Sequence, residues 1–551
     1  MVGEPFFTPG VPISIDRKGL GDAGAGDLAV VSIAGRRPRL ERVLGRADAV
    51  EAVLEGLLVE RGELGAVEPY SPPALDAEGR VDLRDLLSFT IDPGTAKDFD
   101  DAISVRQEPG GGLRVWVHIA DVSHFIPAGS PLDHGAAARG FSVYVPGRVA
   151  PMLPHELADD LCSLRPQEDR LCVTVEIPFS EGIEPGEASF YRSVIRSRER
   201  LTYGRAEAIL AGRESADPAL AEALRLAERV ALELRRRRFA RGALRIESPE
   251  VVFAFDGQGG VERAWKESEP HAHALVEELM ILANEAVAGL LASRQREVLY
   301  RVHEPPDPQA VALLLAKLTD LEVPTPAAPE PEAMAPGAAA RLAAEASERV
   351  TEYVQQAGRG VEAFPALILR ALKQARYDPH NLGHSGLASP AYCHFTSPIR
   401  RYPDLVVHRA LLRELGLSDE PLPEDLSEAA EQTSAREREA AQVEYAADEI
   451  CLAWLLEAQL FELGWECIFE GEIIGLIGSG LFVRFGEVFE GYLPARRLPG
   501  DYFELNPLAT ALQGRRAGKT FRLGDPIKVR VEEIRRAEGK VELSLADVGG
   551  A

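Results

Sequence analysis

The order of two hydrophobic periodicities between residues 82 and 460 constrains the fold more than any other feature. Strand-like segments come first, namely LLSFTID, AISVRQ, LRVWVHIADV and LCVTVEIPF, and long segments of helical periodicity follow them. Runs of strands followed by runs of helices favour the α+β class over alternating β-α-β units. We therefore predict a central domain over residues 76–462 that contains an antiparallel sheet plus helices.

Two smaller modules are predicted on either side, because 551 residues exceed what one hydrophobic core organises. Residues 1–75 contain two strand-like segments and the amphipathic helix ADAVEAVLEGLLVERG, which indicates a small α+β module, and a linker rich in proline and glycine lies around residues 70–80. Residues 463–551 alternate at period two between glycine turns, which is typical of a small antiparallel barrel. The Pro/Ala-rich stretch 322–340 is expected to form an exposed loop.

The net charge of −26, taken alone, argues against a nucleic-acid partner. The basic residues are nevertheless clustered, and only eight of the 61 are lysine. Arginine makes planar, bidentate contacts with phosphate, so an acidic exterior with a basic channel is compatible with this composition. Codon bias accounts for the arginine excess equally well. The clusters lie at residues 36–42, 196–200, 235–241, 400–401, 496–497 and 515–516.

Nothing in the sequence predicts export or a membrane span. The first residues, MVGEPFFTPG, lack the basic and apolar regions of a secretory signal, and no run reaches the roughly 18 uncharged apolar residues that a spanning helix needs. The five cysteines show no paired metal-binding spacing, which predicts reduced thiols. We expect a monomeric protein of the cytoplasm.

The segment FTIDPGTAKDFDDAISV, residues 89–105, gathers four carboxylates in a short stretch of chain. Its Pro-Gly pair predicts a turn that brings Asp92 back toward the other three. Asp98 and Asp100 lie two residues apart and would share one face of a strand. Asp101 would point away from them unless the backbone bends, so a bulge or loop is expected there.

Four carboxylates this close repel one another, and burial without partners would raise their pKa values. A hard cation removes the conflict, because Mg²⁺ takes oxygen ligands and leaves room for phosphate. Two such ions about 4 Å apart would activate a water and stabilise the leaving oxygen in phosphodiester hydrolysis. We therefore predict a site for Mg²⁺, with Mn²⁺ as the alternative ion. A solvated acidic turn or a structural Ca²⁺ loop is the competing interpretation. The predicted ligands are Asp92, Asp98, Asp100 and Asp101.

The segment YCHFTSPIRRYPDLVVHR, residues 392–409, predicts a helix that begins close to two arginines. Thr396 or Ser397 can cap this helix, and an arginine near its N-terminus can clamp a phosphate and offset charge in a transition state. We select Arg400 for this role, with a structural ion pair as the alternative. Tyr144, between apolar neighbours in FSVYVPGRV, could stack on a base or simply fill the core.

Six collinear segments resemble the ribonuclease II/ribonuclease R (RNB) exoribonuclease family and cover roughly residues 82–460. They read TIDPGTAKDFDDAISV, VHIADVSHFIPAGSPLD, YVPGRVAPMLPHELADDLCSLRP, EELMILANEAVA, YRVHEPPDP and HFTSPIRRYPDLVVHR. The resemblance implies processive, metal-dependent hydrolysis of single-stranded RNA from its 3′ end to nucleoside 5′-monophosphates.

The same resemblance implies roles for individual residues. The four aspartates match the metal ligands of the family, Arg400 matches its catalytic arginine, and Tyr144 matches the tyrosine that stacks on the terminal nucleotide. Glu277 falls where the family carries a glutamate that reads the ribose 2′-hydroxyl, the group that separates RNA from DNA. A second such glutamate lies late in the domain, and Glu444 and Asp448 compete for it.

The C-terminal barrel resembles the OB fold of the ribosomal protein S-one type. In that fold Phe482, Phe485 and Tyr492 would lie near the RNA face, together with Arg484 and Arg496. Stacking of bases on such aromatic rings tolerates any sequence. The alternative for each ring is that it fills the interior of the barrel.

The N-terminal module departs from the family, whose two cold-shock barrels need well over a hundred residues. A winged-helix-like unit or one vestigial cold-shock barrel fits the roughly 75 residues present, and the helix and the basic ribbon GRRPRLER favour the first. Two rival functions are a catalytically inactive RNA-binding protein and a metal-dependent DNA nuclease. The presence of all four aspartates and Arg400 argues against the first, and Glu277 argues against the second.

Overall fold

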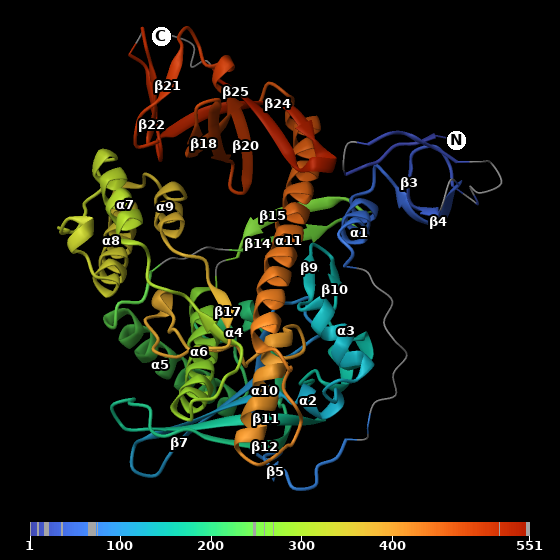
Figure 1. Cartoon of the computed structure of the whole chain (residues 1–551), viewed down its shortest axis with the longest axis vertical. Coiled ribbons are helices and arrows are strands. Elements are labelled where there is room, and N and C mark those ends of the chain that lie inside the picture. Colours follow the sequence, from blue (N-terminus) through green and yellow to red (C-terminus); the bar gives the residue numbers. More distant parts are fainter. Residues whose placement is uncertain are drawn as a thin grey trace.

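The chain consists of a central α+β domain, a barrel above it, and a small module to one side (Figure 1). This computed structural model describes residues 2–7, 10–15, 21, 23–34, 37–63, 73, 75–245, 250–257, 259–267, 269–516 and 518–546.

A seven-stranded sheet forms the base of the central domain, in the order β13-β6-β7-β8-β11-β12-β5. The four inner pairs from β6 to β12 are antiparallel, and the outer pairs β13–β6 and β12–β5 are parallel. The predicted α+β class with a largely antiparallel sheet is confirmed. The strands are β5 (Val81–Asp82), β6 (Phe89–Asp92), β7 (Asp101–Gln107), β8 (Leu113–Ala120), β11 (Asp169–Phe179), β12 (Ser189–Arg196) and β13 (Glu199–Thr202).

Helices cover one face of this sheet because alternate strand residues present a continuous apolar surface to them. Ile103, Val117 and Val175 enter one buried core with Leu224 and Leu279 from two of the helices. The helices that contribute to this core are α4 (Tyr203–Leu210), α5 (Pro218–Ala240), α6 (Pro270–Ser293) and α10 (Tyr402–Glu414).

Short elements between β8 and β11 contribute to a second buried core, which Phe99 of the β6–β7 connection also enters. They are α2 (Val122–Phe125), α3 (Pro131–Arg139), β9 (Val143–Val145), β10 (Arg148–Ala150) and the single-turn helix η2 (Glu156–Leu161). Two further ribbons complete the domain: β14 (Val251–Phe255) with β15 (Val261–Lys266), and β16 (Tyr300–Val302) with β17 (Arg376–Asp378).

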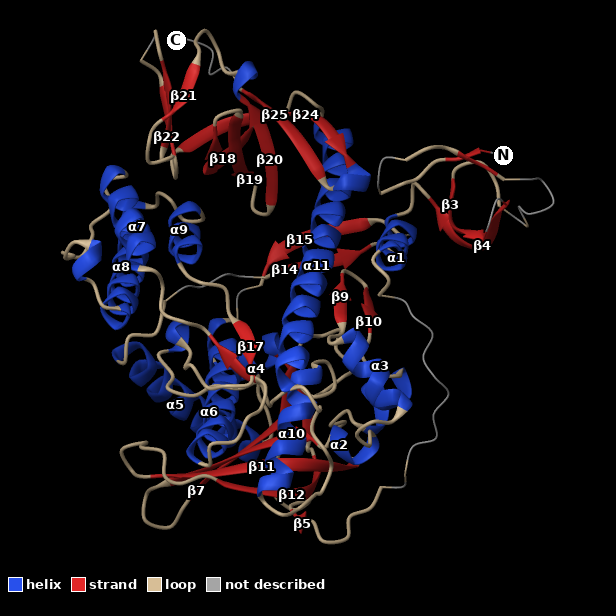
Figure 2. Ribbon diagram, viewed as in Figure 1, coloured by secondary structure: helices blue, strands red, loops and turns tan. Residues whose placement is uncertain are grey.

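The long helix α11 (Leu426–Leu463) runs from the central domain to the barrel (Figure 2). Asp425 caps its start by accepting hydrogen bonds from the backbone N–H groups of Ser427 and Glu428. The helix packs against β9, β15 and β17, and against α1 of the N-terminal module. It therefore joins all three parts of the chain.

A group of three helices, α7 (Pro308–Asp320), α8 (Pro336–Ala357) and α9 (Ala363–Ala371), has a hydrophobic core of its own. The predicted loop at 322–340 is wrong at its end, because α8 begins at Pro336, a favourable first-turn position. Glu472 of the barrel accepts hydrogen bonds from three backbone N–H groups at the start of α9, which fixes the barrel to this group.

The C-terminal region is a closed five-stranded barrel with a small three-stranded sheet beside it, which confirms the predicted barrel. Its strands are β18 (Phe469–Ile477), β19 (Gly480–Phe485), β20 (Phe489–Pro494), β24 (Pro526–Arg535) and β25 (Lys540–Leu545). The small sheet contains β21 (Phe503–Leu505), β22 (Ala511–Gly514) and β23 (Thr520–Arg522).

The N-terminal module contains the short pair β1 (Val2–Gly3) and β2 (Ile13–Ser14), the hairpin of β3 (Asp27–Ala34) and β4 (Arg37–Arg46), and helix α1 (Val50–Glu60). Between residues 2 and 63, the described part holds this one helix, whereas a helix-turn-helix unit needs two. Residues 70–72 and 74 of the predicted linker lie outside the described residues.

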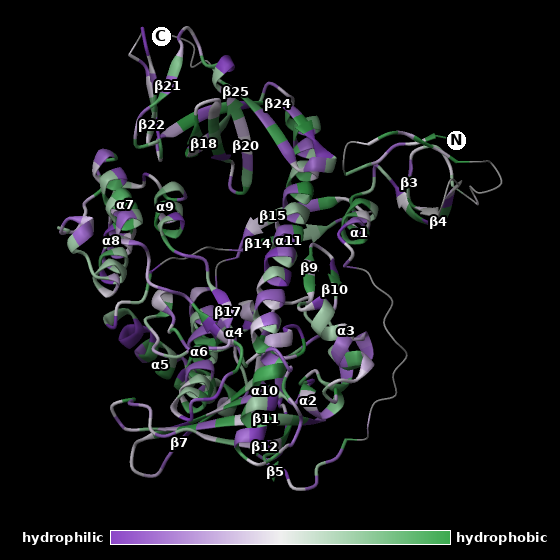
Figure 3. Cartoon of the chain, viewed as in Figure 1, coloured by the Kyte–Doolittle hydropathy of each residue, from purple (hydrophilic) through white to green (hydrophobic). Residues whose placement is uncertain are grey.

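Hydropathy is mixed along the helices, including α11, while apolar residues concentrate in the interior of the central domain (Figure 3). Within the described ranges, no helix combines the length and the apolar character that crossing a bilayer requires.

Candidate active site

The four predicted aspartates lie at one end of the central sheet, around the connection between β6 and β7. Asp92 is the last residue of β6 and Asp101 is the first of β7, so the hairpin brings them back toward each other as predicted. The strand starts only at Asp101, and Asp98 and Asp100 lie in the preceding loop. The expectation that these two share one face of a strand is therefore wrong.

This loop leaves the strand geometry because its backbone bonds to other segments. The Phe99 N–H donates to Ser163 Oγ at 3.0 Å, and the Phe99 carbonyl accepts from the Leu164 N–H at 2.9 Å. The Asp100 carbonyl accepts from the Ala120 N–H of β8, also at 2.9 Å. Hydrogen bonds thus hold the backbone at Phe99 and at Asp100, which fixes the position from which the Asp100 side chain starts.

Burial makes the negative charge of these carboxylates costly. It raises the pKa of Asp92 to about 7, with a further rise from the charge of Asp101, and it raises the pKa of Asp101 to about 6. It also raises the pKa of Asp100 well above its usual range, which Arg400 partly offsets. Protons or a cation must therefore neutralise part of this cluster.

The carboxylate oxygens suit a hard cation. Within the described part of the chain, Asp92 Oδ2 and Asp100 Oδ2 are buried and accept no hydrogen bond, and the second is close only to the guanidinium of Arg400. Oxygens in this state are suited to binding a metal ion. No three aspartates of the cluster, all of which are described, bring ligand atoms within 4.8 Å of one another. The donor set therefore fits Mg²⁺ or Mn²⁺ in its chemistry, and the carboxylates stand further apart than in a closed shell of ligands.

Arg400 reaches the cluster from the segment before α10. Its Nε lies 3.3 Å from Asp100 Oδ2, and its Nη2 donates to Ser397 Oγ at 3.0 Å. The Ile399 N–H donates to Asp100 Oδ1 at 2.8 Å. The predicted cap by Thr396 or Ser397 is wrong, because α10 starts at Tyr402 with Arg401 as its N-cap residue.

Tyr144, on β9, lies against the same cluster. Its hydroxyl donates to Asp98 Oδ2, and burial together with the charge of Asp98 raises the pKa of the hydroxyl. Its backbone N–H donates to Glu444 Oε1 of α11 at 2.8 Å. Glu444 therefore contacts the site directly, whereas Asp448 lies one turn further along α11.

Glu277 is not brought into contact with the aspartates. It lies on α6 with its side chain 48% exposed, and Arg238 donates to its Oε1 at 3.0 Å. The neighbouring Glu278 is buried, and both of its carboxylate oxygens accept hydrogen bonds from the same guanidinium. Among the described residues, no contact joins Glu277 to the aspartate cluster or to Tyr144.

Tyr203 was not predicted from the sequence, although it lies at the site. It follows β13, whose last residue Thr202 pairs with Asp92. Burial and the charges of Asp101 and Asp92 raise the pKa of its hydroxyl. Its ring stacks on His273, with ring centroids 3.9 Å apart. Only the strand pairing reveals this position, so no local sequence signal could have found it.

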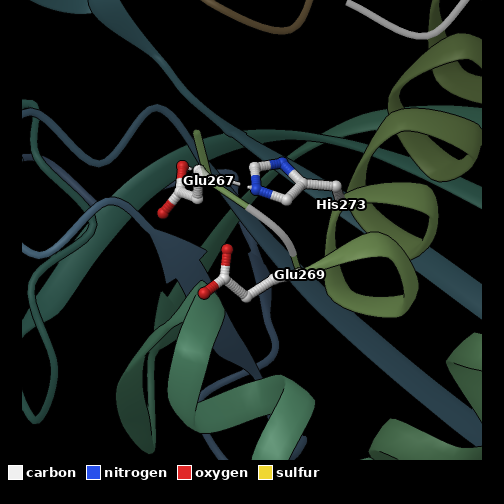
Figure 4. A group of neighbouring side chains, drawn as sticks. All are labelled: Glu267, Glu269 and His273. Carbon is white, nitrogen blue, oxygen red and sulfur yellow. Dashed lines mark ion pairs between the residues drawn. The ribbon is translucent and has the colours of Figure 1, made fainter. Parts of the chain in front are cut away.

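A second group of possible metal ligands lies beside this stack. Glu267, Glu269 and His273 bring ligand atoms within 4.8 Å of one another, and the close-up shows them pointing toward one another between the end of β15 and the start of α6 (Figure 4). His273 Nε2 lies 3.6 Å from Glu267 Oε2. This contact accounts for the proximity of Glu267 and His273 without a metal ion.

The barrel separates the two phenylalanines predicted to bind substrate. Phe485 is fully buried and packs against Phe469 and Phe489, so the prediction that it faces RNA is wrong. Phe482 lies on the other face of β19, partly exposed, with Tyr492 at 5.3 Å between ring centroids. Residues three apart in a strand point to opposite faces, which accounts for the difference.

Comparison with known proteins identifies the class to which this sheet and this site belong. Residues 80–416 match the model of the RNB domain, and residues 466–546 match the S1 RNA binding domain. The first match spans more than half of the chain, so the chain belongs to the RNB family, as the sequence motifs predicted.

Several relatives carry the name ribonuclease R. The Escherichia coli protein is 38% identical over 485 residues, which cover 85% of this chain and 57% of the relative. The Aquifex aeolicus protein is 38% identical over 494 residues, or 87% and 66%. The structure of Mycoplasma genitalium RNase R in complex with ribose methylated single-stranded RNA superimposes with a TM-score of 0.87 at 26% identity, covering 97% of this chain and 85% of that one. The chain thus spans little more than half the length of the Escherichia coli relative.

The raised pKa values predict how metal binding depends on pH. A raised carboxylate pKa means that the metal-free folded protein retains protons that the unfolded chain has released, so its stability falls as pH rises from the usual carboxylate range to about 7. Mg²⁺ must displace these protons. We expect its affinity to rise by about tenfold or more between pH 5.5 and 7.5, since one pKa unit corresponds to a factor of about ten.

Titration calorimetry in buffers of different ionisation enthalpy would measure both the affinity and the protons released. Asp92→Asn should reduce the proton release, while the exposed Asp85→Asn serves as a matched control. An Mg²⁺ affinity that does not change over this pH range would contradict the description of the site.

Proposed function

We propose that this chain is a metal-dependent exoribonuclease that degrades single-stranded RNA processively from its 3′ end and releases nucleoside 5′-monophosphates. The observation that carries the proposal is the meeting of Asp100, Arg400 and Tyr144 around one group of buried carboxylates. The RNB family membership and the similarity to ribonuclease R proteins support it.

The proposed metal ligands are the four aspartates, with Mg²⁺ as the working ion. When bound there, divalent cations lower the pKa of a water and neutralise charge on the scissile phosphate. Arg400, still 44% exposed beside Asp100, would donate to a phosphate oxygen and offset the negative charge that grows in the transition state. A planar guanidinium makes this contact in a fixed direction.

Tyr144 would position the last nucleotide by stacking on its base. Because its hydroxyl is bonded to Asp98, a base stacked on this ring is held at a fixed place relative to a proposed metal ligand. Glu444, which bonds the Tyr144 backbone, is better placed than Asp448 for a contact with the terminal sugar. Glu277 stays the proposed reader of the 2′-hydroxyl, and it would share its carboxylate between RNA and Arg238.

We further propose that the barrel and the N-terminal module bind the RNA chain before it enters the site. Residues 1–75, 76–462 and 463–551 would act as three domains of a monomeric cytoplasmic enzyme. One vestigial cold-shock barrel suits the N-terminal hairpins better than a winged helix does, because only α1 is available there among the described residues.

The barrel surface predicts a clear contrast between two substitutions. Phe482→Ala should weaken RNA binding by ~1–3 kcal/mol through the loss of one stacked base and leave stability unchanged. Phe485→Ala should instead lower the free energy of unfolding by ~3–5 kcal/mol, because it empties a buried site. Fluorescence anisotropy with labelled RNA and chemical denaturation measure the two effects. Weakened RNA binding by a fully stable Phe485→Ala variant would show that the assignment of faces is wrong.

The function itself is tested with a 5′-labelled single-stranded RNA and a DNA of the same sequence, each with Mg²⁺ or with EDTA. Progressive shortening of the RNA alone, and only with metal, is the expected result. RNA that is bound but never shortened would replace the proposal with the catalytically inactive RNA-binding protein, and shortening of both strands would favour a nuclease without sugar selectivity.

A further inference from the structure

Two adjacent arginines precede α10, and the structure gives them different surroundings. The side chain of Arg400 is 44% exposed and faces Asp100. The side chain of Arg401 is 18% exposed and pairs with Asp404, one turn into α10. The charge of Arg401 is therefore satisfied within the protein, while Arg400 is free to act on a ligand as well.

Asp404 is a buried carboxylate that bonds to two positions of the segment before α10. Its side chain is completely buried, and its two oxygens accept from the same guanidinium, Oδ2 from Arg401 Nε at 2.9 Å and Oδ1 from Arg401 Nη2 at 2.7 Å. Oδ1 also accepts from the Ser397 N–H at 2.8 Å. One carboxylate thus joins the two ends of the segment Ser397–Arg401.

This segment forms a tight turn with Arg400 inside it. The N–H groups of Arg400 and Arg401 both point at the Ser397 carbonyl, at 3.3 and 3.0 Å. The Arg400 carbonyl accepts from the Ser142 N–H at 2.9 Å, which fastens the outer side of the turn. The side chain of Arg400 leaves this fixed backbone toward Asp100, with its Nη2 bonded to Ser397 Oγ.

The turn also acts on the aspartate cluster itself. The Ile399 N–H, at the middle of the turn, donates to Asp100 Oδ1 at 2.8 Å. A change in the shape of the turn would move both the Ile399 N–H and the Arg400 guanidinium relative to Asp100. A displacement of about 1 Å in a reacting group can cost about a hundredfold in rate.

We propose that Asp404 is a positioning residue for the hydrolysis: by joining Ser397 to Arg401 it shapes the turn that holds Arg400 against Asp100. It touches neither the proposed metal ions nor RNA and acts entirely through Arg400 and the Ile399 backbone. This inference rests on the proposed function, since it assigns a role within that reaction.

The test is Asp404→Asn, which keeps size and an acceptor for the Ser397 N–H but cannot accept from both guanidinium nitrogens. We expect kcat for single-stranded RNA to fall about 10- to 100-fold, while KM and RNA affinity measured in EDTA stay within about twofold of wild type. In an Arg400→Ala background the same change should lower kcat by clearly less than it does in the wild-type background, because only the route through the Ile399 N–H then remains. Glu222→Gln, which removes an exposed ion pair of the same spacing on α5, is the matched control.

Arg401→Lys provides a second variant, which decides the question if the buried Asp404→Asn protein does not fold. It keeps a positive charge beside Asp404 but cannot make both guanidinium contacts with the carboxylate, so it should lower kcat without affecting RNA affinity, with a smaller loss in an Arg400→Ala background. Wild-type kcat in the folded Asp404→Asn variant, or a loss that adds in full to that of Arg400→Ala, would overturn the inference alone. An inactive wild-type protein would overturn the proposed function and this inference with it.

Discussion

Asp100→Asn should abolish RNA degradation and leave RNA binding intact. The amide keeps the acceptor for the Ile399 N–H but removes a buried carboxylate oxygen proposed to bind the metal ion and its ion pair with Arg400. Since loss of one group that stabilises transition-state charge costs about 10²–10³ in rate, and a metal ligand also affects occupancy, we expect at least about a 10³-fold fall in kcat. Single-turnover kinetics with a labelled RNA measure it.

A readout independent of catalysis accompanies this variant. Mg²⁺ should raise the unfolding temperature of the wild-type protein and of Asp85→Asn, and that rise should be reduced or absent in Asp100→Asn, because ligand binding to the folded state stabilises it. Full activity of Asp100→Asn would remove the aspartate cluster from the mechanism. Equal stabilisation of the wild-type protein and of Asp100→Asn by Mg²⁺ would place the metal ion elsewhere. Glu267 and Glu269 would then be the first residues to test.

Arg400→Ala should lower kcat by about 10²–10³, the usual effect of removing a group that stabilises charge in the transition state. Arg400→Lys should recover only part of the loss, because a lysine retains the charge but not the planar, directed donors. Both variants should still bind RNA in EDTA with nearly wild-type affinity, because the barrel and the remainder of the chain are proposed to make most of the contacts. Rapid-quench measurement of the first cleavage separates kcat from binding.

The control for this series is Arg413→Lys, on the exposed side of the last turn of α10. It should leave every parameter unchanged. An Arg400→Ala protein with wild-type kcat and raised KM would show that this arginine only binds substrate, and that Arg401 or another cation meets the growing charge.

Local chemistry was predictable because the motif residues lie close together in sequence. The strand–turn–strand context of Asp92 and Asp101, the helix beginning near Arg400, and the closed barrel all follow from hydrophobic period and turn residues. The error at Phe485 was avoidable, since Phe482 and Phe485 differ by three positions in one strand and cannot share a face.

The contacts that complete the site join segments that are distant in the sequence. No local sequence pattern indicates such contacts. Glu444 meets Tyr144 across 300 residues and the Ile399 N–H meets Asp100 across 299. The choice between Glu444 and Asp448 therefore required the placement of α11. The different surroundings of Arg400 and Arg401 likewise could not be predicted from the sequence, because they arise from the ion pair with Asp404 and from the shape of a turn.

Product analysis in ¹⁸O-labelled water tests whether water attacks the last phosphodiester, as proposed for the aspartate cluster. Single-stranded RNA is digested with Mg²⁺ in this solvent, and the released nucleotides are examined by mass spectrometry. We expect nucleoside 5′-monophosphates, released from the 3′ end, each with one ¹⁸O in its phosphate. Nucleoside diphosphates that require inorganic phosphate, cyclic phosphates, or internal fragments without ¹⁸O would contradict it.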